Sequence, residues 1–145
     1  MSAERSDAII AAARGWMGTP YRHQASLKGV GTDCLGLVRG VWREVLGDEP
    51  EAPPAYAPGW AETGGSETLA TAARRHLIEM PCTEYRVGDV LLFRWRAGMP
   101  AKHAGIAVSA QAMVHAQEQA SVTEVALSAW WLRHLAFVFR FPGVR

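Results

Sequence analysis

The chain of 145 residues has few cysteines, no long apolar run and almost no net charge, and each shortage excludes a class of protein. Its two cysteines, Cys34 and Cys82, are too few for a disulfide-stapled scaffold, and they form no CxxC pair of the kind that compact zinc modules use. No apolar run approaches the length that a membrane-spanning helix needs. A formal net charge of +1 gives no electrostatic reason to expect nucleic acid as a partner. We therefore expect a protein that binds neither a membrane nor nucleic acid directly.

What the chain does contain is the balance of a folded globular protein, with 49% hydrophobic and 20% charged residues. A length of 145 residues suits one domain, which we place over residues 1–145. Residues 1–7 lead into alanine-rich sequence without a signal-peptide core, so we expect synthesis in the cytoplasm and no export by that route. In that compartment both cysteines are expected to stay reduced.

The first half of the chain shows apolar residues at helical spacing, separated by segments rich in glycine and proline. The loop over 19–32 is long for a plain connection, which indicates a function, and 48–65 reads as an irregular surface excursion. Helices are predicted over 7–17, 33–46 and 66–80, the second capped by Thr32 or Asp33 and the third by Ser66.

The second half changes to short apolar or alternating runs, which are typical of strands. Strands are predicted over 90–95, 104–108, 112–116, 122–127 and 135–141, with a helical turn over 129–132 that Ser128 caps. Helices followed by a meander of strands indicate the α+β class with a mostly antiparallel sheet.

Cys34 is placed in the first turn of the second helix, inside the stretch Gly31–Gly36. A helix N-terminus and a nearby imidazole both lower the pKa of a thiol, and the thiolate is the nucleophile. A cysteine with histidines far away in sequence is the pattern of a candidate cysteine nucleophile. His103, at the head of one strand, is the candidate base and acid. His115, at the end of the next strand, is the candidate orienter of His103 through a ring-to-ring hydrogen bond.

Tyr21, in the loop before the cysteine helix, is the candidate donor to an oxyanion, beside the backbone N–H of Cys34. Asp33 is taken with Tyr21 as an oxyanion or substrate contact. His23, His76 and His134 are assigned no functional role, and the tryptophans are assigned to the core. Trp130 and Trp131 also suit an exposed docking or sugar-stacking site, although the core is the preferred assignment for them too. Spacing alone leaves a zinc site at Cys34, His103 and His115 open.

Several short motifs resemble the NlpC-type cell-wall peptidase family, a papain-like group of cysteine peptidases. They occur in the family's order and cover most of the chain: Gly18–Tyr21, Gly31–Gly36, Arg86–Phe93, His103–Ile106 and Met113–Ala116. The resemblance implies a papain-like fold and hydrolysis of amide bonds in peptidoglycan stem peptides, with no cofactor. It implies Cys34 as nucleophile, His103 as base and acid, His115 as orienter and Tyr21 as an oxyanion or substrate contact. The family often has serine after the nucleophile, whereas this chain has Leu35, so the bond that is cleaved stays open.

Two further segments, 21–29 and 139–142, are similar to a branch encoded among the tail genes of phages and gene transfer agents. That similarity implies tail hub or baseplate proteins as partners and action on the cell wall in the periplasm. Three alternatives accompany it. They are a catalytically silent tail-tip module on the same fold, amidase or acyltransferase chemistry at the same Cys–His site, and a zinc hydrolase.

Overall fold

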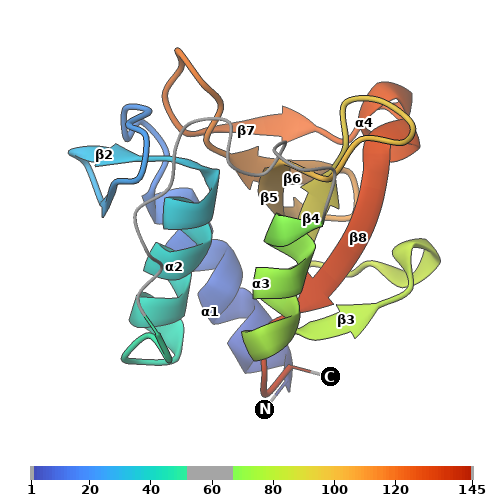
Figure 1. Cartoon of the computed structure of the whole chain (residues 1–145). Helices are drawn as coiled ribbons and strands as arrows, with labels where there is room; N and C mark the ends of the chain where they lie inside the picture. Colours follow the sequence, from blue (N-terminus) through green and yellow to red (C-terminus); the bar gives the residue numbers. More distant parts are fainter. Residues whose placement is uncertain (1, 52–66, 145) are drawn as a thin grey trace.

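The structure, a computed structural model, describes residues 2–51 and 67–144. The three longer helices lie on one side of a twisted antiparallel sheet (Figure 1). The helices are α1 (Ser2–Gly15), α2 (Cys34–Val45), α3 (Thr68–His76) and the short α4 (Ala129–His134), with a 3₁₀ turn, η2, at Cys82–Glu84. The α+β class predicted from the sequence is confirmed.

The main sheet has six strands in the order β3-β8-β4-β5-β6-β7, and every neighbouring pair is antiparallel. The strands are β3 (Ile78–Met80), β4 (Val90–Phe93), β5 (His103–Ser109), β6 (Ala112–His115), β7 (Thr123–Ala126) and β8 (Leu135–Arg140). The central strands β4 and β5 are apolar along nearly their whole length, because both faces of the sheet are covered. They therefore provide a rigid support for the residues at their ends.

A buried apolar cluster lies on each face of this sheet. The larger one joins the helices to the sheet and includes Trp16, Leu37 and Ile106, with α1 and α2 both in contact with β5. The smaller one contains Phe93 and Met113, with Trp131 of α4 packed against it. Directly paired residues share a face, so the pairs Phe93↔His103 and Gly105↔His115 place both histidines on the side of the smaller cluster.

The helix α2 begins where the sequence predicted, because Asp33 caps it through a bond from the backbone N–H of Gly36. Glycine at position 36 is required by close approach: a Cβ there would overlap the carbonyl oxygen of Ala25. Gly40, one turn later, lies directly against the ring of Trp16 in α1. The loop before α2 is thus held tightly against its first turn.

Two of the predicted elements differ in the structure. The helix predicted to reach Met80 ends at His76, and Ile78–Met80 instead form β3, which pairs with β8. Pairing with a distant strand replaced the helical hydrogen bonds here, a choice that local spacing does not reveal. The first helix begins earlier than predicted, at Ser2, and ends at Gly15. The predicted cap Ser66 and most of the irregular segment over 48–65 lie outside the described residues.

The loop over 19–32 is more ordered than a plain connection. It contains a two-stranded sheet of β1 (Ser26–Leu27) and β2 (Gly31–Thr32) and bridges from Pro20 to Ser121 and from Tyr21 to Thr32. These contacts tie the loop to the segment before β7. In the described part of the chain, no helix has the length and apolar character needed to cross a bilayer.

Candidate active site

The thiol of Cys34 lies where the first turn of α2 meets the start of β5. Its Sγ is 4.0 Å from the carbonyl oxygen of Lys102, and the backbone N–H of Ala104 donates a hydrogen bond to it. These two residues flank His103 in the chain, so the sulfur lies against the backbone on both sides of the candidate base. The side chain of Cys34 thus lies next to the backbone of residue 103, and the catalytic pairing of Cys34 with His103 stays a prediction.

The two histidines form the ring-to-ring hydrogen bond that the sequence predicted. His115 pairs with Gly105, two residues beyond His103 on the same face, which makes the histidines diagonal neighbours. Nε2 of His103 lies 2.8 Å from Nδ1 of His115, and the two rings meet nearly edge to face at 83°. A side chain at position 105 would crowd Met113 and His115, so glycine there leaves room for this arrangement. Nδ1 of His103 remains for proton exchange with a substrate or the thiol.

Two tryptophans enclose the imidazole of His103, and the sequence analysis did not assign either of them to the site. Trp95 stacks on one side with ring centroids 5.3 Å apart, and Trp131 stacks at 5.7 Å. Trp131 also contacts His115 edge to face at 5.4 Å. The position of Trp95 could have been predicted from strand pairing. Trp95 lies just after β4, and the end of β4 pairs with His103 at the start of β5. Trp130 is 44% exposed rather than part of the core.

Burial determines the charge of the site. Burial, and to a smaller extent the neighbouring carboxylate of Asp33, raises the pKa of the Cys34 thiol to about 12. The expectation of a lowered thiol pKa is therefore wrong for this structure. The helix N-terminus acts as expected, since the backbone N–H groups of Leu35 and Cys34 lower the pKa, but burial outweighs them. The thiol is neutral in the substrate-free site.

The histidines are neutral for the same reason. Burial, followed by the nearby His115 and Lys102, lowers the pKa of His103 to about 3, and burial also lowers the pKa of His115. A neutral imidazole is a proton acceptor throughout the physiological range. The site therefore holds a thiol and a base that is ready to take its proton.

Asp33 is buried and binds backbone groups of the loop and the helix. Its two oxygens accept hydrogen bonds from the backbone N–H groups of Gly36 and Gln24, both at 2.7 Å. Gln24 adopts a positive φ of 67°, an unusual conformation for a non-glycine residue, and this bond holds it there. His23, which the sequence analysis assigned no partner, has its Nδ1 4.0 Å from Oδ2 of Asp33. The role of Asp33 as a substrate contact stays a prediction.

Tyr21 lies on the same side as the thiol. Burial, and to a smaller extent the nearby Cys34 and Asp33, raises the pKa of its hydroxyl to about 12. The hydroxyl consequently keeps its proton near neutral pH and is able to donate a hydrogen bond. Its oxyanion or substrate role stays a prediction.

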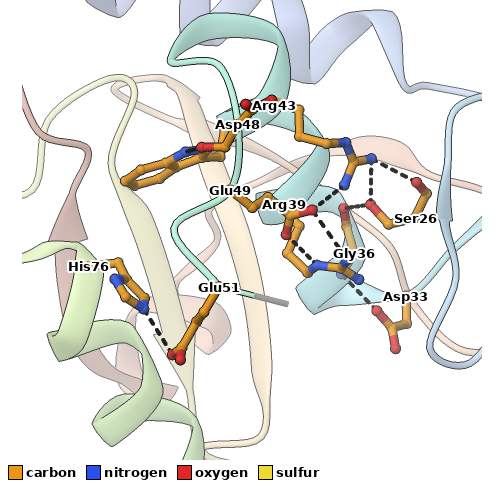
Figure 2. A network of polar contacts seen from close by, with 10 residues as sticks. Ser26, Asp33, Gly36, Arg39, Arg43, Asp48, Glu49, Glu51 and His76 are labelled. Atoms are coloured by element: carbon orange, nitrogen blue, oxygen red, sulfur yellow. Dashed lines mark hydrogen bonds and ion pairs between the residues drawn. The ribbon is translucent and has the colours of Figure 1, made fainter. Parts of the chain in front are cut away.

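A polar network fixes the loop on α2 (Figure 2). Oγ of Ser26 donates to the carbonyl oxygen of Gly36 at 2.6 Å, and Arg43 donates to both the carbonyl oxygen and Oγ of Ser26. Glu49 in turn accepts hydrogen bonds from Arg43 and Arg39. The segment after α2 thereby braces the turn that presents Cys34.

The family comparison agrees with this geometry. The model of the NlpC/P60 family matches residues 18–140, which span the loop, the cysteine helix and both histidine strands. The chain belongs to the NlpC/P60 family. No curated protein sequence matches this NlpC/P60 chain.

Solved structures show the same fold. An NlpC/P60 family protein from Bacillus cereus aligns with a TM-score of 0.68 at 18% identity, over 94% of this chain and 40% of its own. A lipoprotein-like NLP/P60 family protein from Staphylococcus aureus aligns with 0.67 at 20% identity, over 100% and 43%. The NlpC/p60 domain of the peptidoglycan hydrolase SagA aligns with 0.64 at 21% identity, over 94% and 98%. This chain spans less than half the length of the first two.

The remaining candidates of the sequence analysis lie outside the site. His76 is partly buried and contacts Glu51, and His134 stacks on Trp130 with ring centroids 4.0 Å apart. Both cysteines are free thiols. Among the residues that the structure describes, no three His, Cys, Asp or Glu side chains form a metal-binding group, and the facing nitrogens of the two site histidines bind each other.

Gly36→Ala is expected to destabilise the NlpC/P60 domain by about 3 kcal/mol, since its Cβ would overlap the backbone of residue 25 and push the loop away from Cys34. Urea unfolding measures the loss. Gly15→Ala is the matched control, because its Cβ meets only the flexible end of Lys28 and alanine favours a helix. Equal stability of the two variants would contradict this packing argument.

Acid is expected to destabilise the folded domain through His103. Its pKa is about 3 in the folded state, against an ordinary value of 6.5 in an unfolded chain, so between these pH values the unfolded chain binds more protons. The stability is complete above pH 6.5 and falls by up to about 1.4 kcal/mol per unit as the pH drops. Urea unfolding from pH 7 to pH 4 measures the slope. His103→Gln should flatten it, and equal slopes for the wild type and His103→Gln would disprove the assignment.

Proposed function

We propose that this NlpC/P60 domain is a cysteine-type hydrolase of amide bonds in peptidoglycan stem peptides. One observation carries the proposal: Sγ of Cys34 lies against the backbone on both sides of His103, whose Nε2 is hydrogen-bonded to His115. A nucleophile, a base and an orienter for that base are the groups that acyl transfer to a thiol requires. The peptidoglycan hydrolase SagA, whose domain has the same fold, supports the choice of substrate class.

The reaction begins with a neutral pair. As Sγ of Cys34 attacks the carbonyl carbon, its proton passes to Nδ1 of His103. The negative charge on the carbonyl oxygen is stabilised by the backbone N–H of Cys34 and the hydroxyl of Tyr21. His103 then gives the proton to the leaving amine, and the C–N bond breaks to leave a thioester on Cys34. A water molecule, deprotonated by His103, hydrolyses the thioester and restores the thiol.

His115 orients the base throughout these steps. With Nδ1 of His103 accepting the thiol proton, Nε2 carries a hydrogen and donates it to Nδ1 of His115. This bond fixes the tautomer and stabilises the imidazolium that forms transiently. His115 is thus a positioning residue.

A tail-associated role completes the proposal. The similarity of residues 21–29 and 139–142 to tail-encoded relatives supports a place among the hub or baseplate proteins of a phage or gene transfer agent. There the enzyme opens the cell wall locally for DNA delivery and acts in the periplasm. Detection of the chain in purified particles, together with delivery by particles that carry Cys34→Ala, tests this part separately.

Digestion of purified peptidoglycan, followed by mass spectrometry, tests the activity. A new carboxyl group and a new amine within the stem peptide are expected, and Cys34→Ala should release neither. Separation of the peptide from the sugar-linked lactyl group would identify an amidase instead. No product from any peptidoglycan type, in the presence of tail partners as well, would leave the silent structural module as the function.

A further inference from the structure

Trp131 contacts both rings of the histidine pair. Its indole stacks on the imidazole of His103 at 29°, with ring centroids 5.7 Å apart, and meets the imidazole of His115 edge to face at 84° and 5.4 Å. The centroids of the two imidazoles are themselves 5.0 Å apart, so the three ring centres form a nearly equilateral triangle. The indole therefore lies beside the hydrogen bond between Nε2 of His103 and Nδ1 of His115.

Trp131 is held in place by its own helix and by the sheet. The side chain of Ser128 caps α4 by accepting a hydrogen bond from the backbone N–H of Trp131. The indole meets the ring of Phe93 edge to face, with centroids 4.8 Å apart, and packs against the smaller apolar cluster. Phe93, at the end of β4, is the residue that pairs with His103 on β5. The strand pair that aligns His103 thus also supports the ring that lies against it.

The bond between the imidazoles decides which nitrogen of His103 accepts a proton. A neutral imidazole carries its hydrogen on either nitrogen, and only the tautomer with hydrogen on Nε2 leaves Nδ1 as the acceptor. A hydrogen bond is electrostatically stronger where water is excluded. Both rings are buried, with 5% of His103 and 2% of His115 exposed, and the indole of Trp131 covers a part of each. Without the indole, water would reach Nε2 of His103 and Nδ1 of His115 and compete for their hydrogen bond.

We propose that Trp131 is a positioning residue: by covering the bond between the two imidazoles, it holds His103 in the tautomer whose Nδ1 accepts the thiol proton. The low pKa of both histidines agrees with a site from which water is excluded. Trp131 acts only through His103 and His115. Its catalytic consequence rests on the proposed hydrolase function, whereas the tautomer of His103 is a property of the folded protein and is measured without substrate.

Nitrogen-15 NMR of the imidazoles at neutral pH tests the proposal, with His103→Gln to assign the signals. In the wild type, Nε2 of His103 should carry the hydrogen and Nδ1 should not. Trp131→Leu should give the averaged shifts of two tautomers, and its Nε2 hydrogen should exchange with water at least about tenfold faster. Trp131→Phe keeps a flat apolar ring and should preserve the wild-type signals. Trp130→Leu removes a 44% exposed indole from the same helix and should preserve them too.

Two outcomes of the NMR measurement overturn the proposal. They are wild-type signals in Trp131→Leu, and equal changes in Trp131→Leu and Trp130→Leu. Circular dichroism first confirms that the variants are folded. If Trp131→Leu does not fold, Ser128→Ala replaces it, because this change removes the cap of α4 and leaves the indole itself intact. Faster exchange of the Nε2 hydrogen in Ser128→Ala supports the positioning role, and unchanged exchange overturns it.

Steady-state kinetics on a stem peptide measures the catalytic consequence. Trp131→Leu should lower kcat by about tenfold or more and leave KM within about twofold, because His103 moves protons only after the substrate is bound. Trp131→Phe should recover most of kcat. A change in KM alone would make Trp131 a substrate contact and overturn the positioning role. If the wild type cleaves no peptide, the hydrolase function fails, while the NMR signals still decide whether Trp131 holds the tautomer of His103.

Discussion

Replacing Cys34 by alanine is expected to lower kcat on a stem-peptide substrate by at least about 10⁴-fold, because no other group forms the thioester. His103→Ala should be nearly as severe, and the double variant no worse than either single one, since the two residues act as a unit. His115→Ala should cost about 10²-fold, and His115→Asn less, because an amide oxygen still accepts the Nε2–H of His103. Steady-state kinetics on one defined peptide measures all of these variants.

Cys82→Ala is the matched control for the nucleophile. It removes the second free thiol, which lies in η2 and has no role in the proposed reaction, and should leave kcat/KM unchanged. Circular dichroism and thermal unfolding confirm that each variant is folded. Full activity in Cys34→Ala, or additive losses in the double variant, would falsify the nucleophile–base pair.

Removing one partner of the buried ion pair between Asp89 and Arg140 is expected to cost about 3–5 kcal/mol of unfolding free energy. Asp89 is fully buried, and Nε and Nη2 of Arg140 bind its two oxygens, each at 2.9 Å. Asp89→Ala leaves the guanidinium buried without its counter-charge. The damage reaches the site, because Asp89 precedes β4 and β4 aligns His103 through the pair Phe93↔His103. Urea unfolding measures the loss.

Two comparison variants make this result specific. Asp89→Asn combined with Arg140→Met removes both charges and keeps an acceptor for the backbone N–H of Arg86, so it should recover much of the loss. Glu79→Gln breaks an exposed pair with Arg74 and should change stability by about 0.5 kcal/mol or less. If Asp89→Ala and Glu79→Gln lower the unfolding free energy by equally small amounts, burial does not determine how much the Asp89–Arg140 ion pair contributes to stability.

Particular residues show how far the sequence predicts the site. The cap at Asp33 and the position of Cys34 in the first turn followed from local chemistry, because a side chain that caps a helix acts within three residues. The contact between His103 and His115 followed from two apolar strands adjacent in sequence, which commonly pair with each other. Five short motifs in order were enough to indicate the family.

Other features depended on contacts between distant segments. The segment Ile78–Met80 has helical spacing, yet it pairs with β8, some sixty residues later, and becomes a strand. Trp95 and Trp131 come from the connection after β4 and from α4, and only packing places them on the two sides of His103. No spacing rule relates these positions.

By itself, the sequence determined the α+β class, the helix start that presents Cys34 and the pairing of the two site histidines, since caps, periodicity and neighbouring strands are local signals. Only the tertiary structure decided the protonation of the site and the contact of Trp131 with both histidines. Burial depends on every element that packs around a group, and here it reversed the shift in the pKa of Cys34 that the helix N-terminus alone would produce.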